Sequence, residues 1–261
     1  MSETTVSGTG ASQPSPAPGM RARRVFAQAK FETAAVLRNG EQLLLALILP
    51  LGLLVFLTTT PLLDALGAIP PGGDRLSIAL PGTLGLCLAS TAFTGQAIAT
   101  AFDRRYGVLA QLATTPLGTT GLILGKLGAV IGVVVIQFAL AFGIAGILGY
   151  RGGLDILALI ITTILGTATL LALGLLMAGT LRAEATLGAA NLVWVLMAGA
   201  GGLVLPATGE WGTIVGCLPS GALGDAMRAS LAGTWDFTAL IVLLVWSLVG
   251  ALAARRWFRF E

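Results

Sequence analysis

The sequence predicts an all-α, polytopic membrane protein with six transmembrane helices, an N-terminal helix at the membrane surface and a short cytoplasmic helix between spans two and three. Three observations predict this class. Apolar residues make up 56% of the 261 residues and charged residues only 10%, whereas soluble domains average about 25% charged residues. Several apolar stretches reach the roughly 20 residues that a helix needs to cross a bilayer. Lysine and arginine are also concentrated in alternate connecting segments, as the positive-inside rule describes.

The N-terminal part divides into a tail and a basic segment. Residues 1–20 are rich in Ser, Thr, Gly and Pro, a composition that cannot bury a core, so we expect a disordered tail. Arg21, Arg23 and Arg24 open the next segment, which runs to Arg38 and places several apolar residues on one helical face. We interpret this segment as a helix lying in the cytoplasmic interface of the membrane; a plain basic flank is the alternative. Residues 21–261 would form the transmembrane domain.

Six apolar runs follow, and each is predicted to be a membrane-spanning helix. Their expected bounds are 43–63, 78–101, 125–148, 156–180, 187–205 and 237–254. Proline stands inside the first run at Pro50 and near the start of the second at Pro81. The segment 206–236 is too long and too apolar for a plain loop. It predicts short helices that dip into the outer leaflet, with an amphipathic surface loop as the alternative.

The distribution of basic residues predicts the orientation of the chain. Twelve Lys and Arg residues fall on the side of the termini and only three, Arg75, Arg151 and Arg228, fall on the other side. The acidic residues divide six and six, so lysine and arginine alone carry the bias. Both termini are therefore expected in the cytoplasm, and six spans have the right parity. The net charge of +3 follows this topology, and we expect no nucleic-acid partner.

The connector between the second and third spans has the most distinctive sequence. Residues 103–126 read DRRYGVLAQLATTPLGTTGLILGK, a charged run followed by a helix-like segment, a Thr-Pro break and a Gly-Lys pair. A charged, partly amphipathic connector between two membrane-length helices is well placed to be contacted and moved by a soluble partner. The alternative is a solvated loop that anchors two helices at the headgroups.

The residues present exclude several kinds of chemistry. The middle of the spans contains no Asp, Glu, Lys, Arg or His, although a proton- or sodium-coupled carrier usually keeps such groups there. A nucleotide-binding loop of the form GxxxxGK[ST] is also missing, because Thr120 and Leu127 replace its first Gly and its Ser/Thr around Gly125-Lys126. Cys87 and Cys217 have no metal-ligand spacing. We expect no catalytic, cofactor or metal site, and an energy source on another polypeptide or passive operation.

Three polar residues within the spans, Gln96, Gln137 and Asn191, are candidates for a substrate pathway. Hydrogen bonds between helices explain the same residues equally well. The sequence leaves both interpretations open.

The order of these parts resembles the permease subunit of type 2 ABC exporters, the group that contains daunorubicin-like drug efflux, polysaccharide and lipid exporters. The resemblance covers roughly residues 22–261. It rests on LRNGEQLLLALILP (37–50), FDRRYGVLAQLATTPLGTTGLILGK (102–126), LPSGALGDAMRASLAG (218–233) and the tail ARRWFRFE (254–261). The chain departs from the family pattern at Arg105 and Gln111, where the family often has Glu.

The resemblance implies a plasma-membrane exporter in which this chain pairs with a second permease chain, the same or homologous, above two copies of an ATP-binding subunit. ATP would be bound by that partner, and an amphipathic small molecule, lipid or glycan precursor would move outward. The 103–116 segment would be a coupling helix that contacts the ATPase. The residues expected to carry that contact are Asp103, Arg104, Arg105, Tyr106, Gly107, Leu109, Leu112, Thr115 and Pro116.

Other classes of function fit the sequence less well. A non-transporting membrane scaffold or assembly factor is the main alternative, but it would not need a charged connector with a Thr-Pro break. A channel would need a ring of polar or charged pore residues, and an intramembrane enzyme would need paired acids, a His cluster or an activated Ser. Neither pattern is found in the spans.

Overall fold

The computed structural model describes residues 44–69, 73–108 and 118–257, together with the isolated residues Ala27, Lys30, Thr33, Ala34 and Gly40. The predicted disordered tail, 1–20, lies outside the described residues. The predicted interfacial helix, 21–38, also lies outside them except for four of the isolated residues.

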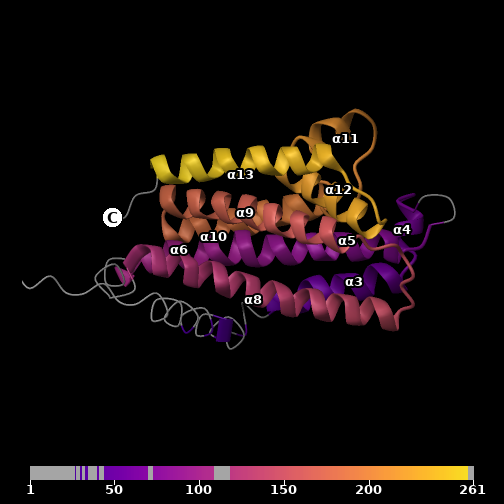
Figure 1. The fold of residues 1–261 in the computed structure, drawn as a ribbon, viewed down its shortest axis with the longest axis horizontal. Helices are drawn as coiled ribbons and strands as arrows, with labels where there is room; N and C mark the ends of the chain where they lie inside the picture. Colours follow the sequence, from indigo (N-terminus) through magenta and orange to yellow (C-terminus); the bar gives the residue numbers. More distant parts are fainter. Residues whose placement is uncertain are drawn as a thin grey trace, which may run out of the picture.

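Within those ranges every regular element is helical, so the all-α prediction is confirmed for the described part of the chain (Figure 1). The elements in chain order are η1 (Leu44–Ile48), α3 (Leu49–Thr59), α4 (Leu62–Ala65), α5 (Leu76–Leu88), η2 (Ala89–Gly95), α6 (Gln96–Arg105), α8 (Gly118–Ile147), α9 (Ile156–Thr180), α10 (Ala183–Gly199), α11 (Gly209–Gly216), α12 (Pro219–Leu231) and α13 (Phe237–Trp257). The two η elements are π-helical, and η2 joins α5 to α6 in one continuous helix.

Four helices in the described part are long and apolar enough to cross a bilayer: Leu76–Arg105, Lys126–Ile147, Ile156–Thr180 and Phe237–Trp257. They correspond to the second, third, fourth and sixth predicted spans. The first and fifth predicted spans correspond to shorter apolar helices, Ala46–Thr59 and Ala183–Gly199. Four of the six predicted spans are therefore found at membrane-crossing length among the described residues, and the prediction of six is not confirmed.

Both shorter helices end at residues that disfavour helix. The first predicted span stops at Thr59 because Pro61 follows two residues later, and the residue before a proline is pushed out of the helical conformation; Thr60 is extended. The fifth stops at Gly199, where the sequence continues Ala-Gly-Gly. Gly202 adopts a positive φ of 72°, which glycine reaches without steric penalty. The chain then runs as an irregular loop from 200 to 208.

The continuous helix α5–η2–α6 forms the centre of the bundle. In its apolar 18-residue stretch, 94% of the residues are buried. Other helices and the 200–208 loop surround it. The loop approaches closely because α5 carries glycines: a Cβ on Gly82 would lie 2.9 Å from the Val204 Cα, and one on Gly85 would lie 2.7 Å from the Leu203 side chain. Small residues thus let backbone pack directly against the central helix, as is common in membrane bundles.

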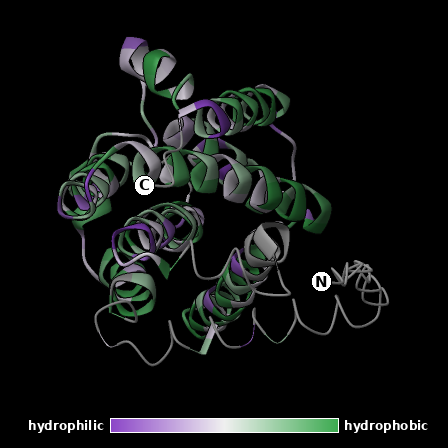
Figure 2. Cartoon of the chain, turned by 90° about the vertical axis from the view of Figure 1, so that its left-hand side faces the viewer, coloured by the Kyte–Doolittle hydropathy of each residue, from purple (hydrophilic) through white to green (hydrophobic). Residues whose placement is uncertain are grey.

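The outward faces of the bundle are apolar. Viewed from the end at which α6 and α13 finish, hydrophobic residues cover the outer sides of the helices as well as the spaces between them (Figure 2). Val135 on α8, Ile164 on α9 and Leu248 on α13 are each more than half exposed. Soluble monomers rarely expose continuous apolar surface of this kind, whereas a lipid bilayer covers it without penalty.

Between α10 and α13 the chain forms a helical hairpin, α11–α12, that reaches into the bundle. α12 runs beside α9, because Ser230 Oγ lies 3.3 Å from Thr162 Oγ1 and Leu223 packs on Gly166. Its 13 residues span about 18 Å, which is about half the hydrocarbon thickness of a bilayer. The predicted short helices in 206–236 are therefore present, and the turn between them, at Cys217 and Leu218, is exposed on the side of the bundle.

Side chains donate hydrogen bonds to the irregular backbone of this region. The Trp246 indole N–H donates to the Cys217 carbonyl at 2.9 Å, and the Arg228 guanidinium donates to the Gly202 carbonyl at 2.8 Å. Arg228 also pairs with Asp225 at 2.9 Å. Non-helical backbone is tolerated at membrane depth only where protein or water satisfies it, and these two side chains do so here.

The outer attachment of the hairpin depends on Asp155, which precedes α9. The Ala158 N–H donates to its carboxylate at 2.9 Å and the Trp235 indole donates at 2.8 Å. These hydrogen bonds, that from Ala158 first, hold the pKa of Asp155 below its ordinary value. The Asp155 N–H in turn donates to the Ser230 carbonyl, which ties the start of α9 to the end of α12.

Candidate functional site

By their positions in the sequence, the charged residues of the described ranges form two groups at opposite ends of the bundle, and two of them, Asp225 and Arg228, stand inside the hairpin helix α12. The basic end is where α6 and α13 finish and α10 begins. It carries six bases, Arg104, Arg105, Lys126, Arg182, Arg255 and Arg256, and two acids, Asp103 and Glu184. The opposite end carries three bases, Arg75, Arg151 and Arg228, and six acids, Asp64, Asp74, Asp155, Glu210, Asp225 and Asp236. This separation is the one that the alternating connecting segments predict.

At the basic end, Arg104 holds the turn between α9 and α10. Its guanidinium donates to the carbonyls of Gly179, at 2.8 Å, and Leu181. Gly179 belongs to the last turn of α9 and Leu181 follows directly after the helix, at an end where backbone acceptors have no helical partner and a positive charge is favoured. Arg104 therefore joins the central helix to the α9–α10 turn.

Two ion pairs flank this contact. Arg105 pairs with Glu184 in the first turn of α10 and lies 5.7 Å from the centre of the Tyr106 ring. Asp103 pairs with Lys126 of α8 at 2.8 Å. The Asp103–Lys126 pair joins the helices on either side of the connector. Together with Arg104, these contacts tie the end of the central helix to α8 and to α10.

A basic cleft of about 380 Å³ lies between these elements and is lined by Ala101, Arg104, Arg105, Arg182, Ala183 and Glu184. The remaining predicted coupling residues are in the connector. Tyr106 is 67% exposed, and Gly107 ends the helix with a φ of 69°. The rest of the predicted coupling helix, with Leu109, Leu112, Thr115 and Pro116, lies outside the described residues.

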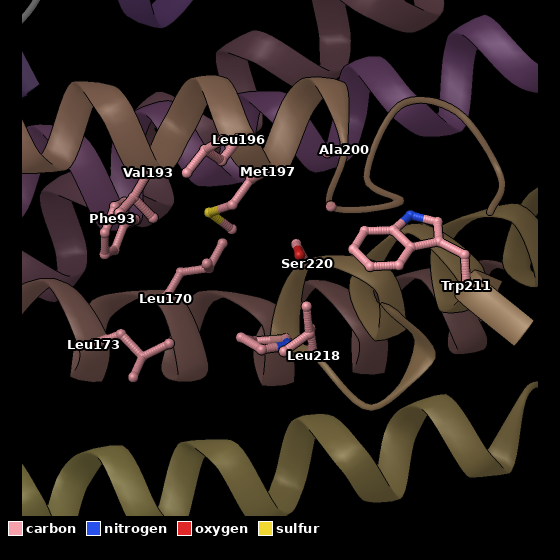
Figure 3. Close-up of a pocket in the computed structure, with 12 residues that line it drawn as sticks. Phe93, Leu170, Leu173, Val193, Leu196, Met197, Ala200, Trp211, Leu218 and Ser220 are labelled. Atoms are coloured by element: carbon pink, nitrogen blue, oxygen red, sulfur yellow. The ribbon is translucent and has the colours of Figure 1, made fainter. Parts of the chain in front are cut away.

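The second candidate site is an apolar cleft of about 320 Å³ under the α11–α12 hairpin (Figure 3). Four parts of the chain form it: η2, the middle of α9, the second half of α10, and the two arms of the hairpin. The lining residues are Phe93, Leu170, Leu173, Val193, Leu196, Met197, Ala200, Gly201, Trp211, Leu218, Pro219 and Ser220. The walls are almost entirely apolar and carry no charged side chain.

Ser220 supplies the hydroxyl group of this lining. It is 4% exposed, and Figure 3 shows its side chain facing the open middle of the cleft, with the Trp211 ring on one side and Leu170 and Met197 on the other. Its hydroxyl makes no hydrogen bond with any described residue. The cleft therefore has mainly apolar walls, and its side-chain hydrogen-bonding groups are the Ser220 hydroxyl and the Trp211 indole N–H.

The three predicted pathway residues do not gather at one site, and none of them lines the apolar cleft. Gln137 is fully buried and donates to the Ala46 carbonyl in η1 and to Thr91 Oγ1 in η2. Asn191 donates to the Leu187 carbonyl of its own helix at 3.0 Å. The Gln96 amide oxygen is buried and has no partner among the described residues. Gln137 thus links three helical segments, as the helix-to-helix interpretation expects.

No protein-family model matches the chain, and no curated protein matches it either. The fold itself defines a class: in the described part, four apolar helices of membrane-crossing length and apolar outer faces are the properties of a helical membrane protein.

Sequence analysis did not identify the apolar cleft. Its lining comes from residues 93 to 220, and each of them fits ordinary helix packing when it is considered alone. The available signal was Leu218-Pro219-Ser220-Gly221, because proline is favoured at the first position of a helix and leaves the next polar residue at an open helix start. That signal predicts where α12 begins, but it does not predict which residues of the other helices lie opposite the start of α12.

Proposed function

We propose that the chain is the membrane-spanning permease subunit of an ATP-binding-cassette exporter, which moves an amphipathic small molecule, lipid or glycan precursor outward. A separate subunit would hydrolyse the ATP. The proposal is supported by the resemblance of the connector and its flanks to type 2 exporters. It is also supported by the way in which the connector is attached to the bundle.

The attachment of the connector is the observation that carries the proposal. The most buried helix, α5–η2–α6, leads directly into the connector at Tyr106. At that point Arg104 holds the α9–α10 turn and Asp103 holds Lys126 of α8. A displacement of the connector would therefore act on the central helix, α8 and the start of α10 together, as a subunit driven from outside requires.

In this proposal the basic end faces the cytoplasm of a plasma-membrane protein, because the lysine and arginine excess marks the cytoplasmic side. Two ATP-binding subunits would dock at the basic end, and a second permease chain would complete the transporter. The hairpin and the opposite end would then face outward.

Co-purification tests the docking. A tagged chain isolated from its native membranes is expected to bring with it an ATP-hydrolysing subunit in equal amount, and Arg105→Glu is expected to reduce that amount several-fold. This substitution reverses a half-exposed charge and also breaks the pair with Glu184. The double variant Arg105→Glu/Glu184→Arg allows the internal pair to form again, and Arg256→Glu serves as a charge-matched control on α13.

A loss in both Arg105 variants that spares Arg256→Glu would support contact of Arg105 with the ATPase. Equal recovery of the ATPase with every variant, or recovery of no ATP-hydrolysing protein at all, would contradict the proposed docking.

Cysteine labelling tests the orientation. In a Cys217→Ser background, cysteines at Gly73 and Arg151 should react with an impermeant maleimide added to intact cells. A cysteine at Arg256 should react only after the membrane is permeabilised. All three positions are exposed, whereas Cys87 is buried. Labelling of position 256 from outside would reverse the orientation and remove the basic end as a docking surface.

A further inference from the structure

We propose that the apolar cleft binds an uncharged, mostly hydrocarbon molecule and holds one carbonyl-type oxygen of that molecule at Ser220 and the N-terminus of α12. The existence of a binding site is inferred from the geometry of the cleft alone. Its assignment as the site of the exported substrate rests on the proposed function. If the cleft is the substrate site, the exported substrate is an apolar compound that carries an ester, amide or ketone oxygen.

The walls of the cleft determine the first part of this inference. Leucine, valine, methionine, phenylalanine and tryptophan side chains enclose about 320 Å³, a volume at the lower end of the range typical of small-molecule sites. A charged group in such surroundings would lose its hydration and gain no counter-ion, since the lining contains none. The part of the ligand that enters must therefore be uncharged.

The depth of the cleft supports an occupant that enters from the bilayer. Its floor includes Leu170 and Leu173, 14 and 17 residues after the start of α9 at Ile156. These residues lie roughly 21 and 26 Å along the helix, so both fall within a hydrocarbon layer about 30 Å thick, with Leu173 nearer its far boundary. At that depth the surrounding medium is lipid, and water does not compete for the hydrogen-bonding groups of the cleft.

The hydroxyl group of Ser220 is the basis for the second part of the inference, that the ligand carries one carbonyl-type oxygen. Other buried serines on these helices donate to the carbonyl one turn back: Ser90 to Leu86 and Ser230 to Ala226. Ser220 stands at the second position of α12, so the helix has no carbonyl one turn before it. A buried hydroxyl without a partner costs free energy, and a ligand oxygen placed in the cleft would remove that cost.

The start of α12 adds backbone donors beside this hydroxyl. Leu218 occupies the capping position and offers no side-chain acceptor, and Pro219 has no N–H. The N–H groups of Ser220 and Gly221 make no hydrogen bond with the described residues, whereas the next one, of Ala222, donates to Leu218. The backbone groups at this point are donors, the Ser220 hydroxyl can donate as well as accept, and the helix dipole adds partial positive charge. They select a hydrogen-bond acceptor.

A plain hydrocarbon chain would fill the cleft and contact its apolar walls, but it would leave these donors without a partner. A molecule that combines a hydrocarbon body with one neutral acceptor oxygen satisfies both features. This distinction can be measured with two probes of equal size.

The experiment uses the full chain in lipid nanodiscs, without an ATP-binding subunit. One probe is a diazirine-bearing fatty-acid methyl ester, and the other is a diazirine alkane with the same number of heavy atoms. Ser220→Ala is expected to weaken ester labelling about 2- to 10-fold, the effect of one lost hydrogen bond, and to leave alkane labelling unchanged. Ala200→Trp, which places a ring in the cleft, is expected to weaken labelling by both probes.

Two matched controls accompany these variants. Ser247→Ala removes an exposed hydroxyl of α13, and Leu192→Trp adds a ring on the outer face of α10; neither should change labelling. In the unmodified chain the ester label should be found on peptides that contain residues 193–201 or 211–220. An equal effect of Ser220→Ala on both probes, no effect on either, or label only on the outer faces of α8 and α13 would overturn the proposal.

The binding measurement is independent of the exporter assignment. A site-specific ester effect together with no ATPase partner would leave a lipid-binding membrane protein. An ATPase partner without the ester effect would leave an exporter whose substrate binds elsewhere.

Discussion

Replacing Gly224 by leucine is expected to prevent the chain from reaching a folded state in the membrane. Gly224 lies on α12 against the irregular loop, and a Cβ there would lie 2.4 Å from the Gly202 carbonyl oxygen and 3.0 Å from that of Leu203. These atoms belong to a buried backbone that Arg228 already holds. They cannot move aside as the tip of a flexible side chain can. We expect a loss of about 3 kcal/mol or more in the free energy of unfolding, at the upper end of overpacking effects.

The measurement is the yield of monodisperse protein after extraction into detergent, followed by the midpoint of thermal unfolding. Gly188→Leu is the matched control, because Gly188 is exposed on α10 and a Cβ there meets nothing within 4 Å. Equal yields and midpoints for the two variants would show that the loop does not pack on α12 as described.

Reconstituted alone in liposomes, the chain is expected to hydrolyse no ATP and to move no solute in response to a pH or sodium gradient. In the four membrane-length helices of the described part, charged residues occur only in the first or the last turn. Lys126, the one nearest to the interior of a predicted span, is paired with Asp103 at 2.8 Å. No ionisable group is therefore placed along the middle of the four membrane-length helices of the described part to bind and release a coupling ion.

Addition of the cognate ATP-binding subunit is expected to produce ATP-dependent export of an amphipathic or lipid-like compound. Liposomes without protein, and liposomes with the ATP-binding subunit alone, provide the controls. Gradient-driven uptake by the chain alone would refute the exporter assignment. It would direct attention to Asp64, Asp155 and Asp236 at the acidic end as carriers of the ion.

The parts of the fold that depend on local sequence were predictable. The fourth span was predicted at 156–180 and is found as Ile156–Thr180, since a polar Asp155 precedes it and an uninterrupted apolar run defines its length. The separation of basic from acidic ends was also predictable, because charged residues cannot remain in the hydrocarbon layer and must follow the helix ends. Composition and spacing are sufficient for both inferences.

The length of the fifth span was not predictable from hydropathy alone. The run 187–205 is apolar apart from Asn191, but its last residues, 200–205, form a loop beside Gly82 and Gly85 of the central helix. A hydropathy window cannot distinguish apolar residues that continue a helix from apolar residues that pack as a buried loop. The carbonyls of that loop are satisfied by Arg228, 25 residues away from Leu203 in the sequence, and only the tertiary structure brings the two together.

By itself, therefore, the sequence determined the class of the protein, the positions of the long helices and the charge of each end, because these follow from the free energy of placing each side chain in water or in hydrocarbon. The tertiary structure alone decided which groups are left without a partner. Arg104 and Ser220 are both polar residues at helix ends, but Arg104 meets the carbonyls of α9 and Ser220 faces an apolar cleft. That difference depends on which distant segment packs opposite each residue, and the order of residues along the chain does not contain it.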